Sequence, residues 1–121
     1  MVEKKKEIKV KKYDIVRVDL GDAVIGSEQG GIRPAVVIQN DKGNYYSPTT
    51  IIMPLTSQKR NLNQPTHILL KKNDVLSEDS IVLGEQIRVV DKIRILQYMG
   101  KVEDKNVQKK IDIVFRSIAE C

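Results

Sequence analysis

Residues 26–40 read GSEQGGIRPAVVIQN, a glycine-rich connection that runs directly into a short apolar segment. Glycines at 26, 30 and 31 permit positive backbone φ angles, which predicts an irregular loop over 21–32. Residues 35–38 are apolar and few enough for a buried strand, and the polar residues 40–44 are typical of a turn. The stretch therefore predicts a loop, a strand and a turn in immediate succession.

Outward from this stretch, the chain alternates between short apolar segments and turn residues. In residues 13–20 the apolar Val16, Val18 and Leu20 fall on one face of a strand. Pro54 has no N–H donor, so we expect its strand to lie at a sheet edge or to carry a bulge there. The other strands that we predict span residues 49–55, 66–72, 80–83, 86–90 and 93–98.

The end of the chain has a different period. Apolar residues recur there at helical spacing, at Val107, Ile111, Phe115 and Ile118. Several short strands followed by one helix favour a mostly β, α+β fold with a small curled antiparallel sheet or barrel. Alternation of strands and helices is absent from the sequence, which argues against a Rossmann or P-loop architecture.

Length and charge divide the chain into a tail and a body. A chain of 121 residues is typical of one domain, which we place at 13–121. Residues 1–12 hold six lysines and two glutamates, a charge of +4, so the body carries only +1 of the total of +5. Such a tail either attracts phosphates non-specifically or is a flexible solvated extension. Charge alone does not decide between these alternatives.

Targeting signals are not evident in the sequence. No apolar run approaches the ~18 residues that a membrane span needs, and no apolar segment follows the basic N-terminus. The single cysteine, Cys121, cannot form a disulfide within the chain. We therefore expect a cytoplasmic protein without membrane association.

Few catalytic constellations are available in this sequence. His67 is the single histidine, and neither a Walker motif nor a zinc-spaced cysteine–histidine cluster is present, so we expect no metal and no cofactor. The glycine loop with Arg33, followed by Thr56, suits transesterification of RNA, because a guanidinium stabilises charge on phosphoryl oxygens. The 2′-hydroxyl of RNA then serves as an internal nucleophile. The alternative is that Arg33 is a structural or phosphate-gripping residue.

The 26–40 stretch resembles the signature segment of MazF/PemK-like toxins, in particular those of Gram-positive bacteria. Three further motifs agree in order and spacing, and the resemblance covers about residues 13–119. They are Ser47-Pro48-Thr49, Pro65-Thr66-His67, and Leu83-Gly84-Glu85-Gln86-Ile87-Arg88 leading to Asp91-Lys92.

This resemblance implies an SH3-like β-barrel of the CcdB/MazF/PemK type with a C-terminal helix. It implies the toxin of a type II toxin–antitoxin system, a homodimer inhibited by a cognate MazE-like antitoxin. The implied activity is sequence-specific, metal-independent and ribosome-independent endoribonuclease cleavage of single-stranded mRNA.

The resemblance also implies which residues act. The catalytic positions fall on Arg33 and Thr56, and Glu28 is either a general base or a substrate contact. RNA contacts are expected at Ser27, Gln29, Gln64, His67, Glu85 and Gln86. Gly84 and the loop at 59–64 depart from the family pattern, and such loops help to set the cleavage sequence.

Two other functional classes compete with a nuclease. A CcdB-like gyrase poison shares the barrel but ends in a tryptophan-containing tail, and this chain has no tryptophan. A non-enzymatic SH3-like binding module usually has an aromatic groove, whereas aromatics make up 4% of this chain. The adjacent Tyr45 and Tyr46 either stack on bases or cover an edge of the core.

Overall fold

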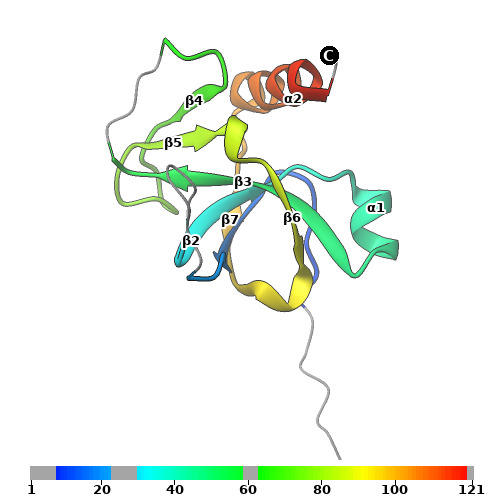
Figure 1. Ribbon diagram of the computed structural model, residues 1–121. Helices are drawn as coiled ribbons and strands as arrows, with labels where there is room; N and C mark the ends of the chain where they lie inside the picture. The colour runs from blue at the N-terminus through cyan, green and yellow to red at the C-terminus, as the bar shows by residue number, and fades with distance from the viewer. Residues whose placement is uncertain (1–7, 23–29, 59–62, 120–121) are drawn as a thin grey trace, which may run out of the picture.

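The computed structural model describes residues 8–22, 30–58 and 63–119 (Figure 1). Within these ranges the elements are seven strands, two helices and two 3-10 turns. In chain order they are β1 (Asp14–Asp19), β2 (Ile32–Val37), α1 (Asp41–Tyr46), β3 (Thr49–Thr56), β4 (His67–Leu70), β5 (Ser80–Leu83), η1 (Gly84–Gln86), β6 (Arg88–Asp91), η2 (Lys92–Arg94), β7 (Ile95–Lys101) and α2 (Lys105–Ala119).

All strand pairs in this sheet are antiparallel. The strands follow the order β4-β5-β3-β2-β1-β7, and β6 pairs with the first half of β3. β3 therefore lies at the centre and contacts three other strands. The predicted α+β fold, a small curled β-barrel with a C-terminal helix, is confirmed.

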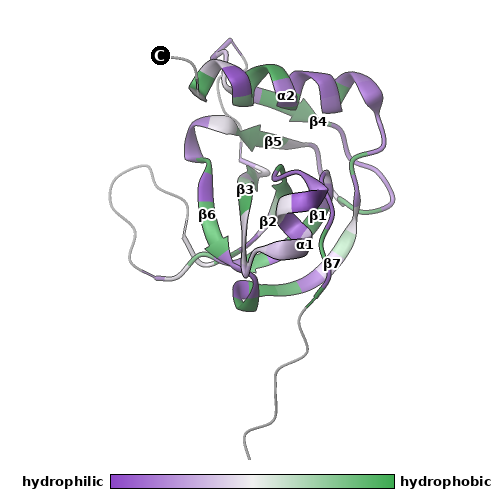
Figure 2. Ribbon diagram, turned by 90° about the vertical axis from the view of Figure 1, so that its right-hand side faces the viewer, coloured by the Kyte–Doolittle hydropathy of each residue, from purple (hydrophilic) through white to green (hydrophobic). Residues whose placement is uncertain are grey.

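Each face of the central strands packs into its own core. Ile15, Val36, Met53 and Leu55 point to one face, where Ile111 and Val114 of α2 cover them. The opposite face carries Val16, Val18, Ala35, Val37 and Ile52, packed with Val90 and Ile95. This division follows from the two-residue period of a strand, which sends successive side chains to opposite faces. Figure 2 shows the matching pattern on α2, where hydrophobic and hydrophilic segments alternate along the helix.

Pro54 lies in the central strand, so the edge position that we expected as one alternative was wrong, and no register shift marks a bulge in its pairing with β2. β3 pairs with β6 through Ile52 and with β5 from Leu55 onward. Pro54 falls between these two pairings, while its other side pairs with Ala35 of β2. A residue without an N–H donor is tolerated at this junction because residue 54 takes part in neither the β6 pairing nor the β5 pairing.

The residues expected to form a turn after β2 instead form the short helix α1. Asn40 caps it, since its side chain accepts a hydrogen bond from the backbone N–H of Gly43 at 2.8 Å. Asparagine is a favoured N-cap because it satisfies one of the free N–H groups of the first turn. The same polar residues that predict a turn therefore also suit a helix start.

Residues 8–12, which we expected in a tail, pack on the domain. Val10 is buried in the second core with Ile8 against it. The Lys12 ammonium lies 3.2 Å from a carboxylate oxygen of Asp112 on α2. Within the described part of the chain, no helix is long and apolar enough to span a membrane.

Gly84 sets the distance between η1 and α2. A Cβ atom at this position would lie 2.5 Å from Cγ1 of Val114 and 2.7 Å from the carbonyl oxygen of Thr66. The Gly84 N–H donates to that same carbonyl at 2.9 Å. The departure from the family pattern at residue 84 is therefore accommodated by a close approach of the helix.

Gly84→Ala should destabilise the protein by about 1–3 kcal/mol, the usual cost of overpacking a filled core. Val114→Ala in the same chain should recover only part of this loss, because the Thr66 carbonyl still opposes the added methyl group. Urea denaturation of the wild type, both single variants and the double variant measures the coupling. A neutral Gly84→Ala variant would show that α2 shifts freely.

Candidate active site

Arg33 and Thr56 lie on the neighbouring strands β2 and β3. The β2–β3 register pairs Ala35 with Pro54, and its continuation by two residues brings Arg33 opposite Thr56. Arg33 also pairs with Val18 of the second core across the β1–β2 ladder. Because directly opposed residues share a face, both side chains lie on the face of the second core. The structure thus brings together the two residues for which we predicted catalysis.

The Arg33 side chain is held by a backbone carbonyl in the connection before β2. Its Nε donates a hydrogen bond of 2.8 Å to the carbonyl oxygen of Gly30. Gly31 has a φ of +73°, and its N–H donates to Gly21 across the connection at 2.7 Å. No other residue in the described ranges hydrogen-bonds the guanidinium, so its two outer nitrogens can take a bidentate anion.

Thr56 is buried, with 3% of its surface exposed. Its Oγ1 accepts a hydrogen bond of 3.2 Å from the backbone N–H of Gln58. A hydroxyl that accepts one hydrogen bond can still donate its own proton. Thr56 can therefore donate to an oxyanion placed beside Arg33.

Two further arginines approach the same connection. Arg88 donates to the carbonyl oxygen of Leu20 at 3.3 Å, and Arg94 donates to that of Asp19 at 3.4 Å. Together with Arg33, three guanidinium groups hydrogen-bond the backbone on either side of residues 21–29, which concentrates positive charge there. Sequence reasoning treated Arg88 only as part of a motif and missed Arg94. For Arg88 a signal existed, since it lies two residues from the buried Val90 and so shares its face.

A second polar group joins β4 to η1. His67 Nε2 lies 2.8 Å from Oε1 of Glu85, and Thr66 Oγ1 donates to Oε2 of the same carboxylate at 2.8 Å. Gln64 in turn donates to Thr66 Oγ1 at 3.2 Å. Three of the residues predicted to contact RNA, Gln64, His67 and Glu85, are therefore linked in one network.

Glu85 has an altered acidity in this network. Burial alone would raise the pKa of its carboxyl group, but hydrogen bonds from His67, from its own backbone N–H and from Thr66 outweigh burial and lower the pKa. The His67 side chain is only 5% exposed. The ionised Glu85 carboxylate thus holds the His67 imidazole in one orientation.

The two groups share one face of the sheet. Thr56 pairs with Ile81 on β5, and His67 pairs with Leu83, two residues further along the same strand. The face therefore runs from Arg33 through Thr56 to His67 across four adjacent strands, roughly 14 Å at about 4.8 Å per strand. Thr56, Ile81 and Leu83 on this strip are buried, whereas Glu85 beside it is exposed.

Part of the predicted site lies outside the described residues. Ser27, Glu28 and Gln29 belong to this part, and their roles stay predictions. Gln86 lies in η1, next to Glu85, and is half-buried. Among the residues that can be described, no three His, Cys, Asp or Glu side chains gather as a metal site would require.

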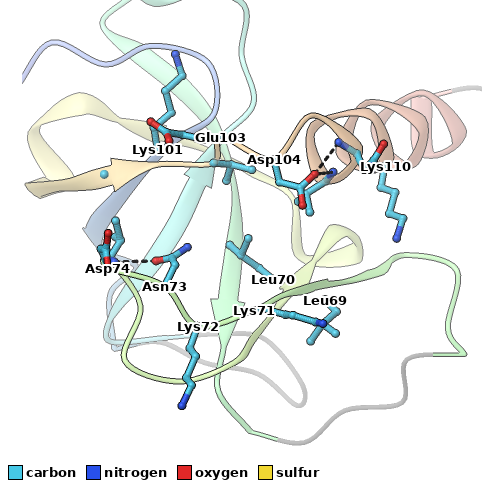
Figure 3. A pocket seen from close by; sticks show the side chains of 15 residues that line it. Leu69, Leu70, Lys71, Lys72, Asn73, Asp74, Lys101, Glu103, Asp104 and Lys110 are labelled. Atoms are coloured by element: carbon cyan, nitrogen blue, oxygen red, sulfur yellow. Dashed lines mark hydrogen bonds between the residues drawn. The ribbon is translucent and has the colours of Figure 1, made fainter.

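A cavity of about 740 Å³ lies elsewhere, between the segment after β4 and the β7–α2 connection. Figure 3 shows Leu70 and the lysines at 71, 72, 101 and 110 around it. None of the predicted site residues lines this cavity. The candidate active site is therefore the strip of sheet and not this cavity.

Comparisons with known proteins agree on one family. The family model described as "PemK-like, MazF-like toxin of type II toxin-antitoxin system" matches residues 11–117. The Endoribonuclease MazF of Staphylococcus saprophyticus is 44% identical over 108 residues, which cover 86% of this chain and 89% of the relative. The Endoribonuclease EndoA of Bacillus subtilis is 40% identical over 111 residues, which cover 91% and 95%.

Solved structures support the same fold. MazF from Deinococcus radiodurans superposes with a TM-score of 0.78 at 20% identity, covering 95% of this chain and all of the other. A mycobacterial endoribonuclease, solved in complex with its cognate antitoxin, has a TM-score of 0.73 at 21% identity and covers 91% and 94%.

The lowered pKa of Glu85 predicts a pH-dependent contribution to stability. A carboxyl whose pKa is lower in the folded state stabilises the protein above its unfolded pKa, near 4.3, and this contribution is lost as pH falls through the folded pKa. Glu85→Gln should therefore lower the melting temperature at pH 7, and the difference from wild type should shrink below about pH 4. Melting curves from pH 3 to 7 measure this.

The matched control for this measurement is Glu103→Gln, which removes an exposed carboxylate outside the network. Its melting temperature should follow wild type at every pH. An equal loss for both variants would show that the Glu85 network contributes nothing specific.

Proposed function

Because this chain belongs to the family of PemK-like, MazF-like toxins of type II toxin–antitoxin systems, we propose that it is a toxin that acts as an endoribonuclease. Two relatives with at least 40% identity are named endoribonucleases, which supports this activity over a CcdB-like gyrase poison or a binding module. The structural observation that carries the proposal is the register that brings Arg33 opposite Thr56.

The proposed reaction is a transesterification within the RNA chain. The 2′-oxygen attacks the adjacent phosphorus, and the 2′-hydroxyl proton passes to a base. The bond to the 5′-oxygen of the next nucleotide breaks, and that oxygen takes up a proton from water as it leaves. The products are a 2′,3′-cyclic phosphate and a 5′-hydroxyl. Since the nucleophile belongs to the substrate, the reaction proceeds without a metal-activated water. The enzyme must align the reacting atoms and stabilise the charge that grows on the phosphoryl oxygens.

Arg33 is suited to stabilise this charge. Its Nε is already engaged with Gly30, which aims the outer nitrogens of the guanidinium. Arginine keeps its proton at any ordinary pH, so Arg33 acts as an electrostatic clamp rather than as a base. Thr56 donates a second hydrogen bond to the same phosphate. Because Thr56 is buried in the free protein, this contact requires a local opening when RNA binds.

The remaining site residues hold the substrate. Glu28 is the conventional base closest in sequence to Arg33, and it accepts the 2′-hydroxyl proton in this scheme. Ser27, Gln29, Gln64 and Gln86 contribute hydrogen bonds to RNA. Glu85 uses both carboxylate oxygens on His67 and Thr66, so it serves mainly to position the imidazole against the substrate.

The substrate in this proposal is single-stranded RNA, since its base edges are not already paired and can be read by side chains. We propose sequence-specific, ribosome-independent cleavage of mRNA in the cytoplasm. Loops that differ from the family, including residues 59–64, set the sequence that is cut.

Two protein partners belong to this proposal. The cognate antitoxin of the mycobacterial relative supports a MazE-like inhibitor for this chain, seated over the strip from Arg33 to His67. Exposed apolar side chains, including Val89, Ile93 and Ile113, leave surface for a two-fold homodimer.

Cleavage should survive an excess of EDTA, because the reaction as proposed needs no metal. A 2′-deoxy sugar on the 5′ side of the cut removes the nucleophile, so that RNA should bind but stay intact. Gel analysis of end-labelled RNA, with chemical identification of both new ends, measures these outcomes. Cleavage of the 2′-deoxy substrate would exclude the internal nucleophile.

Arg33→Ala should lower the single-turnover cleavage rate about 10²–10³-fold, as loss of an oxyanion donor does. RNA affinity should change much less, because the additional charge exists only in the transition state. Arg33→Lys should recover a minority of the rate, since an ammonium lacks the planar fork.

Thr56→Ala should be milder than Arg33→Ala, since it removes one neutral hydrogen bond. Circular dichroism checks that each variant folds, and Arg17→Ala, an exposed arginine on β1, is the matched control. An Arg33→Ala variant that cleaves within a few-fold of wild type would contradict the assignment.

A further inference from the structure

Tyr45 and Tyr46 at the end of α1 are exposed and do not cover the core. Their exposed fractions are 80% and 76%. The two rings contact each other edge to face, with centroids 4.8 Å apart and planes at 82°. Two large rings in water are a marked exception to the burial of aromatic surface. At these exposed fractions both rings offer surface on which another flat ring can stack.

The backbone beneath these rings is fixed. A helix of six residues is too short to be stable alone. The Asn44 side chain donates to the Gln39 carbonyl at 2.8 Å and accepts from the Thr50 hydroxyl at 2.6 Å. The buried Lys92 ammonium donates to the Asn44 carbonyl oxygen. Because α1 is already ordered, binding there costs little additional entropy.

Lysines lie on α1 and beside Tyr45. Lys42 on α1 is exposed, as are Lys9 and Lys11 in the segment before β1. Residues 8–11 and Tyr45 line a common cavity of about 510 Å³, together with Asp14, Asp41, Asn44 and Lys92. Asp41 is engaged there by the backbone N–H of Lys12 at 2.7 Å. Lysines at 4, 5 and 6 precede this segment in the sequence.

This surface is separate from the candidate active site. α1 directly precedes β3, whereas Thr56 is the last residue of β3 (Figure 1). A strand of eight residues spans roughly 25 Å, so the two sites lie at opposite ends of the domain.

We propose that Tyr45, Tyr46, Lys9, Lys11 and Lys42 form a second, sequence-independent contact surface for single-stranded RNA, here the tyrosine surface. Bases stack on the rings and phosphates pair with the lysines, the combination that binds single strands without reading them. The inference rests on the proposed function in taking RNA as the ligand. It adds a contact that holds the RNA chain outside the cleavage strip.

The test compares two RNAs made uncleavable by 2′-deoxy sugars at the cut. One is as short as the cleavage motif, and the other extends well beyond it. Fluorescence polarisation should show that Tyr45→Ala/Tyr46→Ala weakens binding of the long RNA by about fivefold or more, the loss expected for one stacked base. The short RNA should bind as it does to wild type.

Three variants complete the design. Tyr45→Phe/Tyr46→Phe keeps both ring faces and should retain the affinity for long RNA. Tyr98→Ala removes an exposed tyrosine on β7 and should change nothing. Lys42→Ala should flatten the salt dependence of binding, whereas loss of the tyrosines should leave that slope unchanged.

Equal binding of long RNA by the Tyr45→Ala/Tyr46→Ala variant and wild type would overturn the inference. A changed oligomeric state of that variant in sedimentation would also overturn it, since α1 would then be an interface between copies. Single-turnover cleavage of the short RNA by the same variant should match wild type. Failure of wild type to cleave any RNA would instead refute the proposed function, and the binding comparison would still report on the tyrosine surface.

Discussion

The pairing of β3 with three neighbours is the constraint on which the rest of this structure depends. β3 exchanges β6 for β5 along one side at Pro54 while β2 runs along the other. This register decides which side chains share a face, and it therefore places Thr56 opposite Arg33 and on the same face as His67. A shift of the β3 register by one residue would turn the Thr56 side chain into the core beneath α2. The geometry of the candidate site is thus a property of backbone pairing more than of the site residues themselves.

Much of this arrangement can be predicted from sequence. The alternation of Val16 and Val18 and the helical spacing of Val107 and Ile111 identify elements that the structure contains, because local periodicity reflects which side is buried. Phe115, which we predicted on the same face of the helix, is instead exposed. Pro54 was misplaced, because sequence does not show that a central strand changes partner there. α1 was missed because asparagine favours turns and helix caps alike.

The candidate site was predictable in part, from family resemblance rather than from local periodicity. Arg33 and Thr56 followed from resemblance to a family, and the strand register shows how two residues 23 positions apart in the sequence come near each other. The bond between His67 and Glu85 could not be foreseen, because it depends on how β4 meets η1. Arg94 gave no periodic signal at all. Contacts between segments distant in the chain depend on tertiary packing, which local sequence does not encode.

The contact between Gly84 and α2 has an evolutionary consequence. Residue 84 stands immediately before the carboxylate that holds His67, and its missing side chain makes room for Val114 and for the Thr66 carbonyl. A larger residue can enter this position only after the helix has already moved or lost volume at 114. The order of mutations therefore matters, and homologous lineages should show covariation between the two positions. Such epistasis would let the region around Glu85 diverge among related toxins only in steps that the packing of α2 allows.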